Sequence, residues 1–307
     1  MNDTPHKPVL YKEIIHALQP KAGGRYVDGT LGAGGHARGV LEASAPDGQL
    51  LGLDVDPQAL AIARETLAPY EHRIHLVQAS YMTISSQLKS LQWDLVDGIL
   101  LDLGASSMQF DTPDRGFSFQ YDAPLDMRFG QHVTQTAADI VNTYSEREIA
   151  DLIYEYGEER DSRKIARAIM KARPLHTTFE LVAAIESVSP RRGDRAHPAT
   201  RTFQALRIAV NDELTSIRET LPQAVASLNV GGRLAVISFH SLEDRIVKEF
   251  FREQSKDLVN PPYEKIYEVE REALIKEVYR KPIKPSEEET KNNPRARSAK
   301  LRIAEKM

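Results

Sequence analysis

A glycine-rich turn and a carboxylate that follows it at a distance are the best-spaced binding elements in this sequence. The turn runs from Asp28 to His36 after an apolar pair of residues, and Asp54 stands 22 positions after Gly32. Glycines between a strand and a helix let the backbone approach a ligand closely, and an acid about 20 residues later accepts hydrogens from ribose hydroxyls. The spacing predicts a site for an adenosine nucleoside.

The same turn is compatible with other interpretations. Residues 32–37 also satisfy the Gly-x-Gly-x-x-Ala pattern of dinucleotide-binding enzymes. A nicotinamide-dependent oxidoreductase therefore stays an alternative, and so does a glycine turn with a purely structural use. Titration with each cofactor separates these alternatives.

The composition restricts the chemistry that this chain can perform. Its 307 residues include no cysteine, are 41% hydrophobic and 27% charged, and carry a formal net charge of −4. The absence of cysteine excludes disulfides, thiolate metal sites and a cysteine nucleophile, and we predict no metal site. No apolar run approaches the ~20 residues of a membrane span. Residues 1–5 do not read as a secretory signal, so we expect a cytoplasmic protein without a membrane partner.

The elements that must hold these residues alternate between short apolar runs and helical patterns over the first hundred residues. Such alternation is typical of βα units in a mostly parallel sheet. Buried strands are predicted at residues 26–27, 50–53, 74–77, 95–101 and 234–237. One helix is expected to start near Ala33. Another starts after Asp56-Pro57, a helix cap followed by proline, and runs to about Leu67.

From about residue 111 the strand signals stop and the apolar period becomes helical. Capping patterns at Ser145 and Thr177 start two helices, and helical spacing continues from Phe203 to Leu221 until Gly231-Gly232 ends it. Further expected elements are helices at 162–172 and 242–252 and a half-exposed antiparallel strand pair at 275–279 and 299–303. We predict two domains, which are an α/β domain of residues 1–110 and 212–307 and an inserted helical substrate-recognition domain of residues 111–211.

Several longer strings of residues resemble one family. They are residues 100–107, 115–119 with 124–128, 197–205, 237–245 and 293–298. Together they resemble the RsmH (MraW) family of small-subunit rRNA cytosine-N4 methyltransferases, and the likeness spans nearly the whole chain. Strings of this length are far more specific than a glycine turn alone.

The resemblance implies a fold, a cofactor and a substrate. The fold is α/β, a class I (Rossmann-like) methyltransferase fold with an inserted all-helical domain, and the cofactor is S-adenosyl-L-methionine. The substrate is a cytosine in the decoding centre (P site) of 16S rRNA. The likeness points to rRNA within the 30S ribosomal subunit, while the sequence leaves free 16S rRNA open as the alternative. The family's cofactor pattern falls on Gly34, Gly35, His36, Asp54, Tyr81, Asp102 and Gln109.

Methyl transfer is an in-line displacement, so the protein mainly positions the nucleophile. Methylation at cytosine C5 normally uses a cysteine adduct, which this chain cannot form, and the exocyclic N4 is compatible with that limit. Asp102 follows the predicted strand 95–101, at the edge where α/β sheets bind ligands. We assign it to cofactor binding and, as a catalytic candidate, to orienting the target amine. The alternative is an acid that caps the following loop.

Basic and aromatic residues suggest where RNA binds. Residues 191–207 contain five arginines against one acid, for a charge of +4, and residues 291–307 contain six basic residues against one acid, for +5. Such patches contact phosphates, although an isolated charge run is usually a solvated face. The candidate RNA-binding residues are Arg115, Phe117, His197, Arg201, His240, Arg295 and Arg297. For Phe117 the alternative is a core position, and for His197 and His240 it is a backbone hydrogen bond in a turn.

A second class of function stays open beside the enzyme. A non-catalytic ribosome-assembly factor would bind rRNA through the same basic patches and transfer no methyl group. The sequence leaves the oligomeric state open, with a homodimer as one expectation.

Overall fold

The computed structural model describes residues 8–130, 132–190, 197–259, 269–270 and 272–307. It divides into two compact units. The sheet unit comprises residues 1–104 and 214–307, and the helical unit comprises Ala105–Glu213. The helical unit begins before residue 111 because α5 (Ser107–Asp111), capped by Ser106, belongs to it. None of the described helices is both long and apolar enough to cross a membrane.

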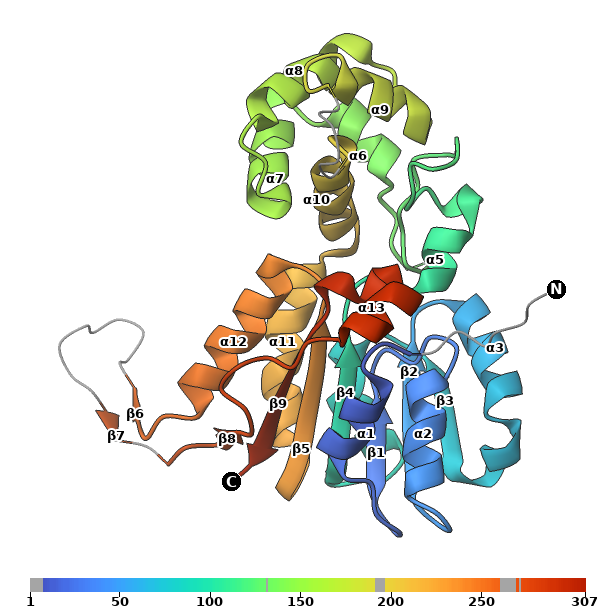
Figure 1. The fold of residues 1–307 in the computed structure, drawn as a ribbon, viewed down its shortest axis with the longest axis vertical. Coiled ribbons are helices and arrows are strands. Elements are labelled where there is room, and N and C mark those ends of the chain that lie inside the picture. Colours follow the sequence, from blue (N-terminus) through green and yellow to red (C-terminus); the bar gives the residue numbers. More distant parts are fainter. Residues whose placement is uncertain (1–7, 131, 191–196, 260–268, 271) are drawn as a thin grey trace. The chain divides into compact units, whose positions relative to one another are not determined.

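A seven-stranded sheet in the order β3-β2-β1-β4-β5-β9-β8 forms the centre of the sheet unit (Figure 1). Its strands are β1 (Arg25–Asp28), β2 (Gln49–Asp54), β3 (Ile74–Gln78), β4 (Val96–Asp102), β5 (Leu228–Ser238), β8 (Ile275–Glu277) and β9 (Lys300–Lys306). The first five strands are parallel, whereas β9 is antiparallel to both of its neighbours. The predicted parallel α/β sheet is therefore confirmed, and its strand order reverses beside β1, where such sheets bind ligands.

Helices cover both faces of this sheet, as Figure 1 shows. One core contains residues of α1 (Tyr11–Leu18), α2 (Gly35–Ala43) and α3 (Pro57–Thr66). The other core contains residues of α4 (Ile84–Ser90), α11 (Glu213–Ala226) and α12 (Ser241–Gln254). Alternate residues of a strand face opposite sides, so Leu100 packs in the first core and Leu101 in the second. The two packed faces fix the edge where the strands end.

The helical unit has a core of its own, which contains Ile140, Ile153, Ile165, Leu181 and Leu206. Its longer helices are α6 (Ala137–Thr143), α7 (Glu146–Gly157), α8 (Ser162–Ala172), α9 (Thr178–Glu186) and α10 (Ala199–Asn211). The predicted starts of α7 and α9 are confirmed, because Ser145 and Thr177 each form a capping box. A capping box satisfies backbone N–H groups at the start of a helix, and its spacing is readable in the sequence.

Two expectations about the chain between residues 203 and 232 were wrong. The helical stretch is broken at Asp212, whose φ of 46° ends α10 before α11 begins. Aspartate tolerates this left-handed conformation better than most residues. The glycine pair does not end a helix, because α11 ends at Ala226 and Gly231 lies within β5, near a register shift against β4.

The C-terminal strand is more buried than its alternating pattern suggested. The antiparallel pairing of β8 with β9 is confirmed, but residues 301–304 of β9 are all buried. The reason is that β9 pairs on its other side with β5, so it lies inside the sheet and not at the edge. Arg302 is buried in this strand, and its guanidinium donates to Asp244 of α12 at 2.7 Å. This ion pair compensates the charge that burial removes from water.

Shorter elements complete the chain. They are η1 (Ala68–Arg73), η2 (Tyr81–Thr83), η3 (Pro113–Arg115), η4 (Pro294–Ser298), α13 (Glu287–Asn292) and the small pair β6 (Leu258–Val259) and β7 (Val269–Glu270).

Candidate cofactor site

The glycine turn lies between β1 and α2, as predicted, with the helix starting at Gly35 and not at Ala33. Gly32 and Gly34 have φ of 52° and 81°, a region that favours glycine. A Cβ atom on Gly35 would lie 2.4 Å from Pro8 Cγ, so a larger residue does not fit there. No side chain caps the first turn of α2, which leaves its backbone N–H groups directed at the space in front of the helix.

The turn and the carboxylate of Asp54 are joined directly. Asp54 Oδ2 accepts a hydrogen bond from the Gly32 N–H at 2.8 Å, and Oδ1 accepts one from the Asp56 N–H at 2.8 Å. Burial raises the pKa of Asp54, while these two N–H bonds act in the opposite direction. A carboxylate has about four acceptor positions, so Asp54 can also accept hydrogens from ligand hydroxyls.

Two further acids approach Asp102, the last residue of β4. Asp102 Oδ1 is buried and has no hydrogen-bond partner among the described residues. Burial raises the pKa of Asp102 well above its usual value, and the nearby carboxylates of Asp28 and Glu243 raise it further. Burial likewise raises the pKa of Asp28 to about 7. Burial and neighbouring carboxylates disfavour the charged form of an acid, so the setting of Asp102 favours its protonated form more than water does.

His36 stands beside this acid. Its Nε2 lies 2.9 Å from the Val9 carbonyl oxygen, and its Nδ1 lies 3.8 Å from Asp102 Oδ2. A carbonyl oxygen only accepts, so Nε2 carries a hydrogen, and Nδ1 is the ring nitrogen that faces Asp102. Because Oδ1 is shielded while the Asp102 side chain is 25% exposed, a ligand reaches this acid through Oδ2.

Tyr81 begins η2 and borders the same turn. A Cβ atom on Gly29 would lie 3.1 Å from Tyr81 Cβ and 2.7 Å from a methyl group of Leu101. The structure thus brings Gly34, Gly35, His36, Asp54, Tyr81 and Asp102 together at the carboxyl ends of β1, β2 and β4.

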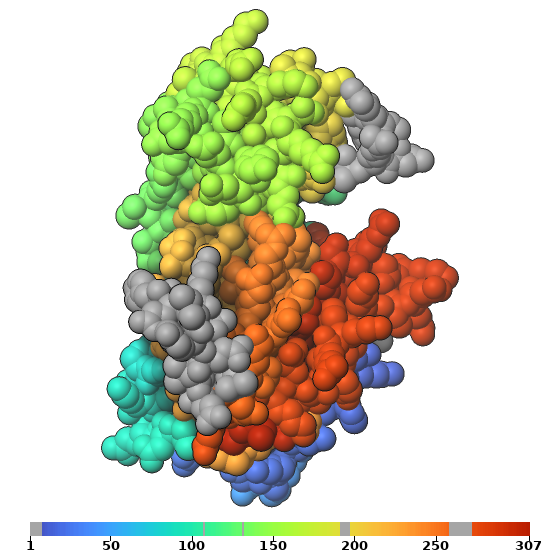
Figure 2. Space-filling view, turned by 90° about the vertical axis from the view of Figure 1, so that its left-hand side faces the viewer, coloured from blue at the N-terminus to red at the C-terminus, as the bar shows by residue number. Residues whose placement is uncertain are grey.

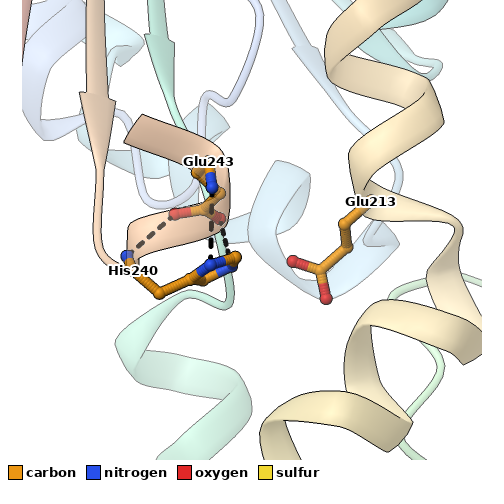
Figure 3. A group of neighbouring side chains, drawn as sticks. All are labelled: Glu213, His240 and Glu243. Carbon is orange, nitrogen blue, oxygen red and sulfur yellow. Dashed lines mark hydrogen bonds and ion pairs between the residues drawn. The ribbon is translucent and has the colours of Figure 1, made fainter. Parts of the chain in front are cut away.

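His240 and Glu243 form a capping box at the start of α12 (Figure 3). Glu243 Oε2 accepts from the N–H groups of Phe239 and His240 at 2.7 and 3.2 Å, and His240 Nδ1 accepts from the Glu243 N–H at 3.5 Å. The turn hydrogen bond that was left open for His240 is therefore present, and its contact with substrate stays a prediction. Glu213, also drawn in Figure 3, belongs to the helical unit, where its carboxylate pairs with Arg207.

In the helical unit, two predicted site residues hold backbone groups. Gln109 Oε1 accepts from the Ser106 N–H at 2.9 Å as part of the capping box of α5. Arg115 Nη2 donates to the carbonyl oxygens of Arg128 and Phe129 at 2.9 and 3.0 Å. These bonds shape the loop after β4, and the predicted ligand contacts of both residues stay untested.

The aromatic residues around Phe117 face inwards. Phe117 is 5% exposed and lies in the core of the helical unit, stacked on Phe129 with ring centroids 5.6 Å apart. The core alternative describes this ring, and base stacking by Phe117 stays a prediction. His197 stacks on Phe119 at 4.6 Å and accepts from the Ala199 N–H through Nδ1 at 3.2 Å, which is the backbone alternative.

The basic patch at residues 191–207 has fewer arginines available for RNA than the sequence suggested. Arg207 donates two hydrogen bonds to the Glu213 carboxylate at 2.8 and 2.9 Å, which uses its guanidinium inside the unit. Arg201 donates to the Glu158 carbonyl oxygen at 3.1 Å but is 55% exposed. The other three arginines, Arg191, Arg192 and Arg195, lie outside the described residues.

The second patch keeps its two central arginines. Arg295 and Arg297 are exposed in η4, within the C-terminal segment that Figure 2 shows in red at the surface of the sheet unit. Two other basic residues of the patch, Lys300 and Arg302, pair with Asp244 at 2.8 and 2.7 Å. The exposed charge is therefore concentrated around η4.

Sequence reasoning missed two members of the acid cluster, Asp28 and Glu243. Asp28 ends β1 as Asp102 ends β4, so the rule that selected Asp102 could also have selected Asp28. Glu243 stands three residues after His240, the spacing of a capping box. That signal predicts a helix start and not an approach to Asp102, which only the packing of α12 produces.

A sequence profile of the MraW methylase family matches residues 3–307. The chain belongs to the MraW methylase family. This methylase is 52% identical to the "Ribosomal RNA small subunit methyltransferase H" of Geotalea uraniireducens, over 100% of both chains. It is 50% identical to proteins of the same name from Dehalococcoides mccartyi, over 100% of this chain and 88% of the relative, and from Heliobacterium mobile, over 98% and 99%.

Membership confirms the predicted family, the Rossmann-like methyltransferase fold class and a methyltransferase that uses S-adenosyl-L-methionine. It removes the nicotinamide-dependent oxidoreductase as an interpretation of the glycine turn. The roles of individual residues in the methylase rest on the geometry described above.

Proposed function

We propose that this methylase transfers a methyl group from S-adenosyl-L-methionine to the exocyclic N4 of a cytosine in the decoding centre (P site) of 16S rRNA. The observation that supports it best is the pairing of Asp54 with the glycine turn beside the buried acid Asp102 at the same sheet edge. The relatives' name, with its small-subunit rRNA, supports the substrate class. The absence of cysteine favours a nitrogen over cytosine C5 as the target.

The residues present are compatible with the cofactor. Asp54 accepts hydrogens from the ribose, the turn at Gly34 and Gly35 lets the backbone approach the ligand, and Tyr81 lines the same turn. The bound cofactor supplies an electrophilic methyl group. Gln109 is proposed to bind it as well.

Asp102 and His36 are proposed to orient the target amine. The lone pair of an exocyclic amine is delocalised into the ring, and an acceptor for its hydrogen helps to localise it. The accessible Oδ2 of Asp102 can accept a hydrogen from the amine. His36 Nδ1 lies 3.8 Å from the same oxygen, so His36 can help to orient the Asp102 carboxyl group towards the amine.

Nucleoside mass spectrometry of 16S rRNA tests the proposal. We expect N4-methylcytidine in RNA from cells with this gene and its loss when the gene is deleted or carries Asp102→Ala. Asp102→Ala with an intact fold and undiminished methylation would remove the role of Asp102. The non-catalytic assembly factor is not supported, because the chain belongs to a methylase family.

The same proposal gives expectations for the form of the substrate, the location of the protein and its oligomeric state. We infer that the assembled 30S subunit, rather than free 16S rRNA, presents this cytosine, so we expect purified 30S particles to be methylated faster than free 16S rRNA. With a ribosomal substrate, we expect the protein to act in the cytoplasm. A homodimer stays a prediction, which sedimentation of the purified protein tests.

A further inference from the structure

A short N-terminal turn lies against the start of α2 and holds His36. Pro8 packs on Gly35 so closely that a Cβ atom there would be 2.4 Å from Pro8 Cγ. The Val9 carbonyl oxygen takes the His36 Nε2 hydrogen at 2.9 Å, in a buried contact. The Tyr11 ring lies nearly parallel to the imidazole, at 16° and 6.4 Å between centroids. The direction of the His36 ring therefore depends on where the Val9 carbonyl points.

The conformation of this turn is strained. Leu10 is fully buried and has φ of 56°, an unusual value for a bulky residue. It precedes the first turn of α1, and no side chain of its own caps that helix. A bulky residue held in this region carries backbone strain and persists only where its surroundings fix it.

The surroundings that fix Leu10 come from the far end of the chain. Glu289 Oε1 in α13 accepts a hydrogen bond from the Leu10 N–H at 2.7 Å, across 279 positions of sequence. Glu289 is itself placed by Ser286, whose Oγ accepts from the Glu289 N–H at 3.0 Å. Bonds to a charged acceptor are stronger than neutral ones, so Glu289 is well suited to hold a strained N–H in place.

We propose that Glu289 is a positioning residue of the cofactor site, which fixes the turn at residues 8–10 and thereby holds His36 towards Asp102. Loss of the acceptor lets Leu10 relax to an ordinary conformation, which rotates the Val9 carbonyl away from His36 Nε2. The ring is then free to change its tautomer or orientation, and the pairing with Asp102 is lost. The consequence for methylation rests on the proposed function, whereas the consequence for His36 does not.

Three variants test the role of Glu289. Glu289→Ala removes the acceptor, Glu289→Gln keeps an amide oxygen in the same place, and Glu288→Ala changes an exposed neighbour in the same helix. We expect the affinity for S-adenosylhomocysteine, measured by calorimetry, to fall about tenfold in Glu289→Ala and to stay within about twofold in the other two variants. If Glu289→Ala does not fold, Glu289→Asp, whose carboxylate is one methylene shorter, takes its place.

Nitrogen NMR of the labelled imidazole gives a readout that a merely structural contact does not move. We expect His36 to be the Nε2–H tautomer in the wild type and in Glu289→Gln, and a mixture of tautomers in Glu289→Ala. An unchanged His36 signal together with wild-type affinity in Glu289→Ala overturns the proposal.

A double-mutant cycle with His36→Asn separates a relay from independent effects. If Glu289 acts through His36, Glu289→Ala lowers the affinity less than about twofold when His36 is already replaced. Equal effects in both backgrounds contradict the proposal. Wild-type protein that binds no S-adenosylhomocysteine contradicts the proposed function instead, and the His36 tautomer then tests the positioning role alone.

Discussion

Asp54 serves the protein and its proposed ligand at once. Its two oxygens accept from Gly32 and Asp56, so the acid closes the glycine turn before any ligand arrives. Predicting this pair from sequence was possible because the number of residues between Gly32 and Asp54 is set by one helix, α2, and one strand, β2. The same geometry makes the site sensitive to small changes at Asp54.

We predict that Asp54→Ala lowers the affinity for S-adenosylhomocysteine at least about thirtyfold, because it removes charge-assisted hydrogen bonds to ribose and releases the turn. Asp54→Asn keeps acceptors for only part of these bonds and is expected to be intermediate. Isothermal calorimetry measures both variants. Asp47→Asn, at an exposed loop acid, is the control and retains wild-type affinity. Equal binding by Asp54→Ala and the wild type contradicts the assignment.

Asp28 gives a prediction about pH. Burial raises its pKa from 3.8 to about 7 in the folded protein, so the fold binds a proton that the unfolded chain releases. The stabilisation by this proton is complete below about pH 4 and is lost as the pH rises towards about 7. We expect Asp28→Asn to reduce this loss and to raise the free energy of unfolding at pH 8 by about 2 kcal/mol relative to the wild type.

Denaturant unfolding between pH 4 and pH 8 measures the effect. Asp97→Asn is the opposite control, since the Arg25 N–H and Lys21 outweigh burial and lower the pKa of Asp97. Removing the Asp97 carboxylate is expected to lower the free energy of unfolding above about pH 4. A pH dependence of Asp28→Asn parallel to that of the wild type refutes the shifted pKa.

Residue type did not show which side chains already have partners inside the protein. Arg207 and Phe117 have the residue types that bind RNA, but one is paired with Glu213 and the other lies in a core. Residue type and spacing do not report such tertiary partners, because they come from segments that the sequence does not bring together.

At the scale of elements, capping patterns predicted helix starts reliably, whereas the helical spacing of apolar residues did not show where helices break. Ser145 and Thr177 started helices where their capping boxes predicted them. The break at Asp212 was invisible because one left-handed residue interrupts a helix without changing the apolar spacing. The burial of β9 was missed because its second neighbour, β5, is far away in the sequence.

The exposed arginines of η4 make that element a testable RNA contact. We predict that reversing the charge of Arg295 and Arg297 together weakens RNA binding and makes its salt dependence shallower, because fewer counterions are released. Filter binding at several salt concentrations measures both quantities. The cofactor affinity is expected to stay unchanged.

A matched control reverses the charge of Lys89 and Arg252, two exposed residues of α4 and α12. It changes the net charge equally and is expected to leave the salt slope as it is in the wild type. If both double variants weaken RNA binding alike, the effect is one of overall charge and η4 is not a specific contact.

At the scale of the whole molecule, the chain has separate cores in its two units. The division into an α/β part and a helical part was expected from the point where strand signals stop. The positions of the boundaries depend on α5 and Asp212, which local signals do not fix. Separate cores predict that one unit can be weakened without the other.

Gly116 is suited to this test. It has φ of 69°, and a Cβ atom there would lie 2.2 Å from the Pro124 carbonyl oxygen, within the helical unit. We expect Gly116→Ala to lower the stability of the helical unit by more than about 2 kcal/mol, measured by scanning calorimetry. Saturating S-adenosylhomocysteine is expected to raise the transition of the sheet unit in the same experiment.

Gly231→Ala is the matched control, since Gly231 has φ of 78° in the sheet unit but open space around its Cβ position. It is expected to cost only about 1 kcal/mol from the backbone. Equal losses in the two variants mean that the backbone angle alone, and not the contact with Pro124, sets the stability.

The place of β9 has a consequence for how the chain is made. Because β9 lies between β5 and β8 in the sheet but follows both in the sequence, a chain that stops before β9 lacks the strand that joins them. Stop codons placed before β9 should therefore yield an aggregation-prone product, while the helical insert, which is translated earlier and has its own core, can collapse during synthesis.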